Sequence, residues 1–500
     1  MASEQPHASR LTHHVSRLTP YVPRPSPLTL RSSPFALGLL VGLTAVTGGL
    51  LLAFAGPLAA AAVFLAGLTA FIVLRDIEIG FWGVIGVVCL LPFATLPVDV
   101  GLTPTFLDVA LAAVVGIWLL GLVTGQQRTI ITAPITIPLL LFIIIAIFSF
   151  IFGLSNGPLT PTLARKFAEL LLSLGFVLVI VDYCSDWGRL ERLVKVILLA
   201  GAAAAAVAIG LWLLPDDTAN TLLNYLVRLG YPGGQVIRFI EENPELSERA
   251  IGTSVDPNVL GGLLLMIGAL AGPQLVSKKP LFPRWLTAVI VSLIFIALIL
   301  TFSRGAMLGL AAGLFFVAVM RYRRLIPTML GVGLLMLVLP VTQGYIGRFV
   351  EGFLGQDLAT QMRFGEYKDA LTLIGRYPIF GVGFAGTPDI DIYLGVANVY
   401  FTIAQNMGLV GLFFFLAIMA TVFGYAFFNR HWFKQHPRPD ALWLGLHAAI
   451  LGALAAGVFD HYLFNLEFHH AVTAFWLFIG LATAGTRLAG ERNRTKYPLF

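Results

Sequence analysis

Runs of roughly 17–25 apolar residues recur along almost the whole chain. A helix rises about 1.5 Å per residue, so each run is long enough to cross the ~30 Å hydrocarbon core of a bilayer. The chain is 58% hydrophobic and 12% charged, a balance that a single soluble core of this size does not need. The pattern predicts an all-α polytopic membrane protein.

These runs predict about 14 transmembrane helices in a bundle over residues 34–487. Their expected centres lie near Leu40, Phe64, Val87, Val114, Ile144, Leu174, Ala204, Met266, Phe295, Ala312, Leu334, Phe413, Leu451 and Phe475. Residues 1–33 carry four arginines, five prolines and one acid, a composition typical of a disordered cytoplasmic tail and unlike that of a cleaved signal. Residues 488–500 are expected to form a second cytoplasmic tail.

Basic residues are distributed unequally over the predicted connections. If both termini are cytoplasmic, 22 of the 32 Lys and Arg residues fall on the cytoplasmic side, as the positive-inside rule requires. A basic cytoplasmic rim beside anionic lipid then explains the net charge of +6, and no nucleic-acid partner is implied. Cys89 and Cys184 are too far apart in this topology to form a disulfide, and no segment has metal-ligand spacing. We therefore expect no metal and no cofactor.

Two connections on the external side are long, about residues 215–257 and 343–396. Long ordered loops in compact proteins are usually functional. Each contains apolar residues near helical spacing, which predicts an amphipathic helix on the outer membrane surface. The residues are Leu222, Leu223, Leu226, Val227 and Leu229 in the first loop, and Ile346, Phe349, Val350, Phe353 and Leu354 in the second. Helices that merely cap the bundle would show the same pattern.

Arg304 is the most informative of the few external basic residues, because it lies between two spans with almost no loop. Its guanidinium is expected at the external interface, where it could bind a phosphate. A snorkelling arginine that anchors a helix end would have the same position.

Arg249 and Asn258 flank the start of the span that begins near Val259. Asp256 or Asn258 can cap this helix, and the unpaired N–H groups of a helix start favour an anion. A capping role alone and a binding role are both consistent with the sequence.

Arg363 and Glu366 share one helical face in the second loop and precede the turn Tyr377–Gly383. Proline and two glycines make this turn rigid, and we expect it to redirect the chain over the bundle. The alternative for Arg363 and Glu366 is a simple i,i+3 ion pair.

Two further polar groups lie at predicted outer ends of spans. Asn398, Thr402 and Gln405 share one helical face, which favours either substrate contact or hydrogen bonds between helices. Asp460, His461, Asn465, Glu467, His469 and His470 crowd one external turn. A histidine there can titrate near neutral pH, although a solvated turn would also have this composition.

Taken in order, these segments resemble the O-antigen ligase and polymerase family over about residues 165–481. Ser303-Arg304-Gly305 is similar to its Ser-Arg-Gly signature, and Arg249 to Asn258 is similar to its Arg-x-x-Gly-Thr segment ending in Pro-Asn. Arg363 to Gly383 resembles its arginine-containing loop helix and Pro-x-x-Gly-x-Gly turn. Asn398 to Gly411 resembles the segment in which many ligases have His-Asn-x-x-Leu, but the histidine is replaced by Ala397.

The resemblance implies a glycosyltransferase of the bacterial inner membrane. It would move a glycan from an undecaprenyl-diphosphate carrier to a sugar or lipid acceptor at the external face, as a polymerase or a ligase. Such a reaction needs positive charge for the departing diphosphate and a base for the acceptor hydroxyl. We expect Arg304, Arg249 and Arg363 to bind the diphosphate without a metal, with Asn258, Asn398 and Gln405 as further substrate contacts. Glu366 and His461 are the candidate bases, and Asp256 is a weaker one.

Two other classes of function remain open at this stage. A flippase for a lipid-linked oligosaccharide, or a small-anion transporter, would have ionisable residues in mid-membrane and a repeated broken helix. The sequence shows neither feature clearly, which favours an enzyme. A non-catalytic member of the family is the other alternative, and it is consistent with Ala397.

Overall fold

The computed structural model describes residues 75–96, 103–125, 130–338, 346–347, 350–352, 354–355, 358–387 and 395–496. All of them lie within one compact unit of the chain, residues 65–500. The predicted N-terminal tail and the spans expected near Leu40 and Phe64 lie outside the described residues, as do Phe349 and Phe353 of the apolar pattern in the second long loop.

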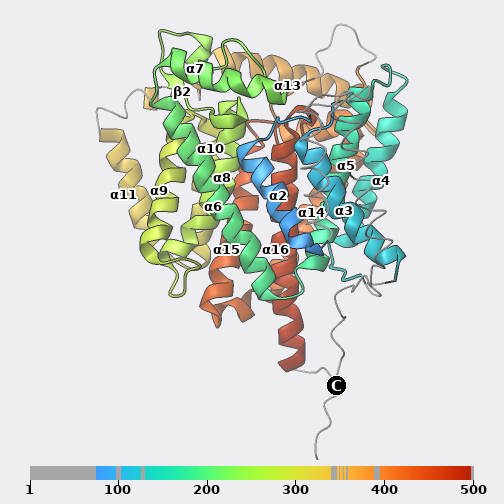
Figure 1. The fold of residues 1–500 in the computed structure, drawn as a ribbon, viewed down its shortest axis with the longest axis vertical. Helices are drawn as coiled ribbons and strands as arrows, with labels where there is room; N and C mark the ends of the chain where they lie inside the picture. The colour runs from blue at the N-terminus through green and yellow to red at the C-terminus, as the bar shows by residue number, and fades with distance from the viewer. Residues whose placement is uncertain are drawn as a thin grey trace, which may run out of the picture. The chain divides into compact units, whose positions relative to one another are not determined.

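The described unit is a bundle of α-helices (Figure 1). The first half contains α2 (Ile77–Leu90), α3 (Phe106–Val123), α4 (Thr136–Gly153), α5 (Pro161–Tyr183), α6 (Trp187–Trp212) and α7 (Asp216–Tyr225). The second half contains α8 (Pro257–Val276), α9 (Arg284–Leu300), α10 (Arg304–Met320), α11 (Leu325–Val338), α13 (Leu358–Arg376), α14 (Val399–Lys434), α15 (Pro437–Ala456) and α16 (His469–Lys496). Short 3₁₀ turns and the strands β1 (Arg238–Phe239) and β2 (Glu248–Arg249) fill the connections.

Each predicted span centre among the described residues falls inside one of these helices. By length and composition, seven of the described helices can cross a membrane, namely α3, α4, α6, α8, α14, α15 and α16. Helices α2, α9, α10 and α11 are apolar but shorter. The chain is therefore a multi-pass membrane protein, while the count of 14 spans and the sidedness of the termini remain predictions.

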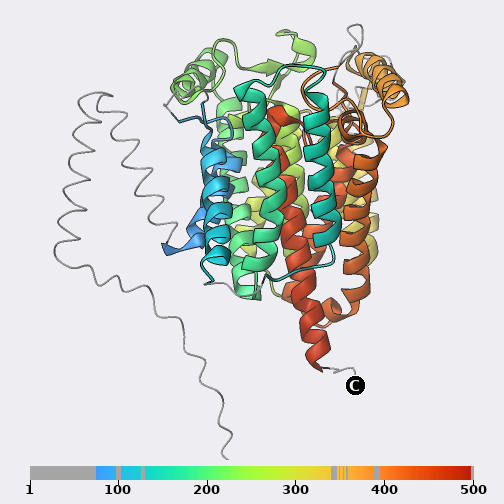
Figure 2. The same ribbon diagram turned by 90° about the vertical axis from the view of Figure 1, so that its right-hand side faces the viewer.

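Helix α16 runs through the middle of the bundle in both views (Figures 1 and 2). Its apolar stretch is completely buried, and Trp476, Phe475 and Phe478 are among the largest fully buried side chains.

Arg165 in α5 forms an ion pair with α3, since its guanidinium lies 2.8 Å from Asp108, and it also lies 3.2 Å from Glu169 of its own helix. These charges close to predicted external ends are thus paired with one another.

Helices α8, α10 and α15 pack closely because small residues line their contacts. A Cβ atom on Gly309 of α10 would lie 2.5 Å from the Gly452 carbonyl oxygen of α15, and one on Gly452 would lie 2.6 Å from the Gly309 carbonyl oxygen. Gly445 approaches the backbone of Leu270 in α8 in the same way. Small residues at such contacts are the common device for close helix packing in membranes. The packing brings the starts of α8 and α10 to the same end as the turn that follows α15.

Helices α7 and α13 lie across this end of the bundle (Figures 1 and 2). The predicted amphipathic helix of the first long loop is shorter than the apolar pattern, because α7 ends at Tyr225 and Leu226–Leu229 forms a 3₁₀ turn. Of its apolar residues Leu223 is buried, whereas Leu222 and Val227 are exposed.

Helix α14 is interrupted at Gly408, and the turn after α13 forms hydrogen bonds with the backbone groups on both sides of the interruption. Gly408 interrupts α14 with a φ of 69°, and the amides of Leu409 and Val410 donate to the carbonyls of Pro378 and Ile379. In return, Val382 and Gly383 donate to the carbonyls of α14 that the break leaves without helical partners. The predicted redirecting turn is present, with φ of 69° at Gly381 and 82° at Gly383.

Candidate functional site

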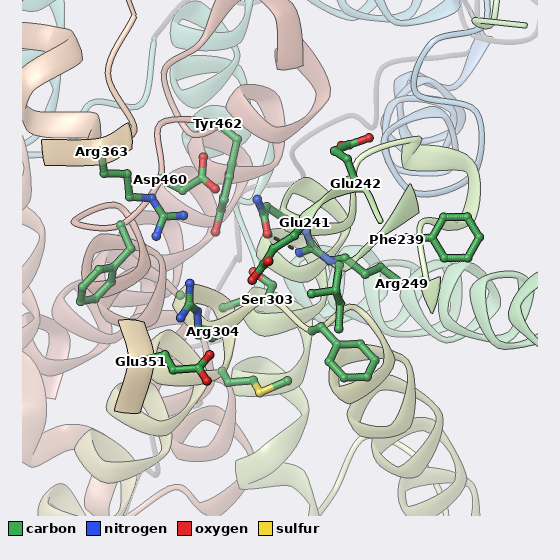
Figure 3. A pocket seen from close by; sticks show the side chains of 17 residues that line it. Phe239, Glu241, Glu242, Arg249, Ser303, Arg304, Glu351, Arg363, Asp460 and Tyr462 are labelled. Atoms are coloured by element: carbon green, nitrogen blue, oxygen red, sulfur yellow. Dashed lines mark hydrogen bonds between the residues drawn. The ribbon is translucent and has the colours of Figure 1, made fainter. Parts of the chain in front are cut away.

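A cavity of about 220 Å³ lies where α8, α10, α13, the β1–β2 hairpin and the turn after α15 meet (Figure 3). Four residues predicted from sequence line it: Arg249, Asn258, Arg304 and Arg363. They come from four different segments of the chain. The fold therefore brings three predicted phosphate-binding guanidinium groups to one cavity.

Arg304 is held at the first position of α10 by a tight link from α9. The Thr301 hydroxyl donates to the Leu298 carbonyl and accepts the Ser303 amide, and Phe302 takes a φ of 52°. The Arg304 guanidinium lies against Gly352, where a Cβ atom would overlap it in its present position. The first N–H groups of α10 add partial positive charge beside Arg304.

Arg249 is fixed by two hydrogen bonds to neutral groups. Its Nε donates to the Thr301 carbonyl at 2.9 Å, and its Nη2 donates to Asn258 Oδ1 at 2.7 Å. Burial lowers the pKa of Arg249 to about 10, against the opposing effect of Asp256 and Asp460. The guanidinium therefore stays charged at neutral pH, while the oxygens to which it donates belong to a backbone carbonyl and a side-chain amide.

Asn258 and Asp256 begin helix α8. Asp256 caps the helix, and its Oδ1 accepts the amides of Asn258 and Val259 at 2.8 and 2.9 Å. Burial, with a contribution from Asp460, raises the pKa of Asp256. Asn258 uses its side chain to orient Arg249. The capping role predicted for this segment thus belongs to Asp256, and Asn258 lines the cavity.

Acidic side chains and one tyrosine complete the lining of this first cavity. Glu241, Glu242, Glu351, Asp460 and Tyr462 all line it. Sequence reasoning noted Asp460 only as part of a crowded turn and did not single out the other four. Nothing in the local pattern of Glu241, Glu242 or Glu351 distinguishes them from solvated loop acids.

Strained backbone gathers at the same cavity. Glu241, Glu242 and Phe302 line it with φ of 54°, 56° and 52°, and Val255 beside Asp256 has a φ of 61°. These are the non-glycine residues with positive φ in the described part of the chain. Such strain costs of order 1–3 kcal/mol per residue and tends to persist at functional sites.

A second cavity, of about 470 Å³, shares a wall with the first. Asn258, Arg363 and Asp460 line both. The rest of its lining is Asp256, Val259, Met362, Glu366, Ala397, His461, Asn465, Glu467 and Phe468. The two predicted base candidates, Glu366 and His461, therefore line the second cavity. Arg363, one of the three arginines of the first cavity, lines it as well.

The base candidates have different surroundings. Glu366 Oε2 accepts the Ala397 amide at 2.9 Å, so one of its oxygens is engaged by the backbone. His461 Nδ1 lies 3.3 Å from Asp460 Oδ1, which also accepts the His461 amide at 2.8 Å. The predicted i,i+3 pairing of Glu366 with Arg363 is not among the described ion pairs.

Asn398 and Gln405 line neither of these two cavities. Asn398 caps α14, where its Oδ1 accepts the amides of Tyr400 and Phe401 at 2.9 and 3.0 Å and its Nδ2 donates to the Val458 carbonyl. Gln405 is buried in α14 beside the Gly408 break. Their contact with substrate stays a prediction.

The geometry predicts that only one of two Arg→Lys substitutions lowers stability. Arg249→Lys removes a fork that bonds two groups at once, so we expect it to lower the free energy of unfolding by about 1–3 kcal/mol. Arg363→Lys removes no hydrogen bond or ion pair described here and should leave the melting temperature within about 1–2 °C of wild type. Thermal denaturation of both variants in the same detergent checks this, and equal losses would contradict the assignment of Arg249.

Comparison with known proteins finds a family match that includes two of the three cavity arginines. Residues 289–416 match the family model described as O-antigen ligase, a segment that holds Arg304, Arg363 and Glu366. The match is shorter than the resemblance inferred from the motifs, and it leaves Arg249, Asn258 and His461 outside. No curated protein matches the chain. Within this multi-pass membrane protein, residues 289–416 are therefore similar to the O-antigen ligase family.

Proposed function

We propose that the protein transfers a glycan from an undecaprenyl-diphosphate carrier to a sugar or lipid acceptor at the external face of the membrane, as a polymerase or ligase. The family match supports transfer of a glycan. The observation that carries the proposal is the convergence of Arg249, Arg304 and Arg363 on a single cavity that shares a wall with a second one.

The first cavity suits the diphosphate of the carrier. Guanidinium groups bind phosphate oxygens through paired, charge-assisted hydrogen bonds, and three of them can offset the charge that develops as the diphosphate departs. They do this without a metal. Phe239, Ile240, Phe302, Met307 and Phe459 line the same cavity and offer an apolar surface to the attached lipid.

The second cavity suits the acceptor. In the proposed reaction an acceptor hydroxyl attacks the anomeric carbon of the glycan. The bond from that carbon to the phosphate oxygen breaks, its electron pair stays on the diphosphate, and the hydroxyl proton passes to a base. Both base candidates line the cavity in which the hydroxyl would lie. The shared wall of Asn258, Arg363 and Asp460 is then where donor and acceptor meet.

Substitution of Arg304 distinguishes a role in binding the diphosphate from a role in anchoring the helix end. Lysine keeps the charge and can snorkel, but it loses the planar fork that grips a phosphate. Arg304→Lys should therefore slow transfer by roughly 10- to 150-fold, the range expected for one lost charge-assisted hydrogen bond in the transition state. The measurement is turnover of a lipid-linked donor by purified protein at matched folded amounts. Near-normal turnover with lysine, together with a lower folded yield with alanine, would assign Arg304 to anchoring.

The base is identified by comparing His461→Gln with Glu366→Gln. Loss of a general base slows transfer by about 10²- to 10⁴-fold, and the base-deficient enzyme should also lose the acidic limb of its pH–rate profile. We expect one of the two variants to show both effects and the other to keep the wild-type profile. Retention of the profile by both variants would contradict the placement of the acceptor in the second cavity.

A further inference from the structure

Tyr462 is a buried tyrosine at the first cavity whose hydroxyl is left without a partner. It belongs to the turn between α15 and α16, and 2% of its surface is exposed. Among the residues that the structure describes, none makes a hydrogen bond with its hydroxyl oxygen. Figure 3 shows the ring reaching down from the turn beside Asp460, and the side chain lines the first cavity together with the three arginines.

Helix α8 makes room for this side chain. Gly262 lies directly beneath the ring, and a Cβ atom there would overlap the ring and approach the hydroxyl oxygen. Phenylalanine would fill the same space without burying a polar atom. Buried polar groups are nearly always hydrogen-bonded, so an unpaired hydroxyl at this depth destabilises the empty protein.

The hydroxyl is suited to donate a hydrogen bond. Burial raises the pKa of Tyr462 well above its ordinary value, and the nearby carboxylates of Asp460 and Asp256 raise it further. Tyr462 therefore keeps its proton at any physiological pH. A protonated phenol in the lining of a cavity that also holds three guanidinium groups can donate to the same anion that they bind.

We propose that Tyr462 binds the diphosphate of the carrier and donates a hydrogen bond to the oxygen that receives the electron pair as the glycan leaves. The proton stays on Tyr462, because the acceptor hydroxyl gives its own proton to the base. This inference rests on the proposed function and adds one contact to it. It gives the unpaired hydroxyl a partner that is present only when the carrier is bound.

Tyr462→Phe in the full-length protein, purified in lipid nanodiscs, tests the inference. We expect a melting temperature equal to or above that of wild type, because the variant no longer buries an unpaired hydroxyl. Turnover should fall by roughly 10- to 150-fold, as for a lost hydrogen bond to a charged group. Undecaprenyl diphosphate should raise the melting temperature of the variant less than that of wild type.

Tyr400→Phe is the matched control. Tyr400 lies in α14, where its hydroxyl donates to the Leu454 carbonyl at 2.9 Å, and it lines neither of the two cavities. Its removal should lower the melting temperature and leave turnover per folded protein near wild type. Only Tyr400→Phe is therefore expected to lower the melting temperature, and only Tyr462→Phe is expected to lower turnover.

The possible failures are distinguishable. A lower melting temperature for Tyr462→Phe with unchanged turnover would make Tyr462 structural and overturn the inference. If wild type transfers no glycan, yet is stabilised by undecaprenyl diphosphate in a way that Tyr462→Phe weakens, the contact is supported and the proposed reaction is refuted. Equal stabilisation of both proteins by the carrier would overturn the contact.

Discussion

The close packing of α15 against α8 and α10 is the contact on which the site depends. Gly309 and Gly452 face one another with no room for a side chain, and Gly445 meets the backbone of Leu270. Without hydrophobic drive between helices in lipid, such close backbone approach supplies much of the packing. This packing fixes the relative heights, along the bundle axis, of the starts of α8 and α10 and of the end of α15. Asn258, Arg304 and Asp460 lie at these three points. The three segments, which all line the first cavity, are thereby held in fixed relative positions.

Around this frame, the polar chemistry is confined to the irregular backbone at one end of the bundle. Apolar helices satisfy their own backbone groups inside a membrane, whereas loops and charged groups need water or protein partners. The positive-φ residues follow the same distribution, since Glu241, Glu242, Val255 and Phe302 all lie at or beside the first cavity. Charges elsewhere are satisfied by ion pairs, such as Arg165 with Asp108 and Arg321 with Asp440. Arg249 differs from these residues, because the groups to which it donates are a neutral carbonyl and a neutral amide oxygen.

Helices and arginines could be predicted from sequence because each leaves a strong local signal. Apolar length marks the helices, and a basic residue on the predicted external side, such as Arg304, stands out against the positive-inside bias. Asp460 and Tyr462 were not selected, because their importance comes from contact with residues some 200 positions earlier, including Gly262 and Asp256. Asn398 illustrates a polar residue whose sequence pattern does not reveal its structural contacts. Its polar helical face predicted a substrate contact, while its side chain caps α14 and bonds the turn after α15.

The central claim is that the cavity of Arg249, Arg304 and Arg363 is a site for the diphosphate of a lipid carrier. The most direct test is the affinity of the purified full-length protein in nanodiscs for three lipids that share one undecaprenyl chain: the diphosphate, the monophosphate and the free alcohol. Each charge-assisted hydrogen bond contributes about 1.5–3 kcal/mol, so the diphosphate should bind at least tenfold more tightly than the monophosphate, and the alcohol most weakly. Equal affinity for all three lipids would show that the chain alone is recognised and would contradict the account.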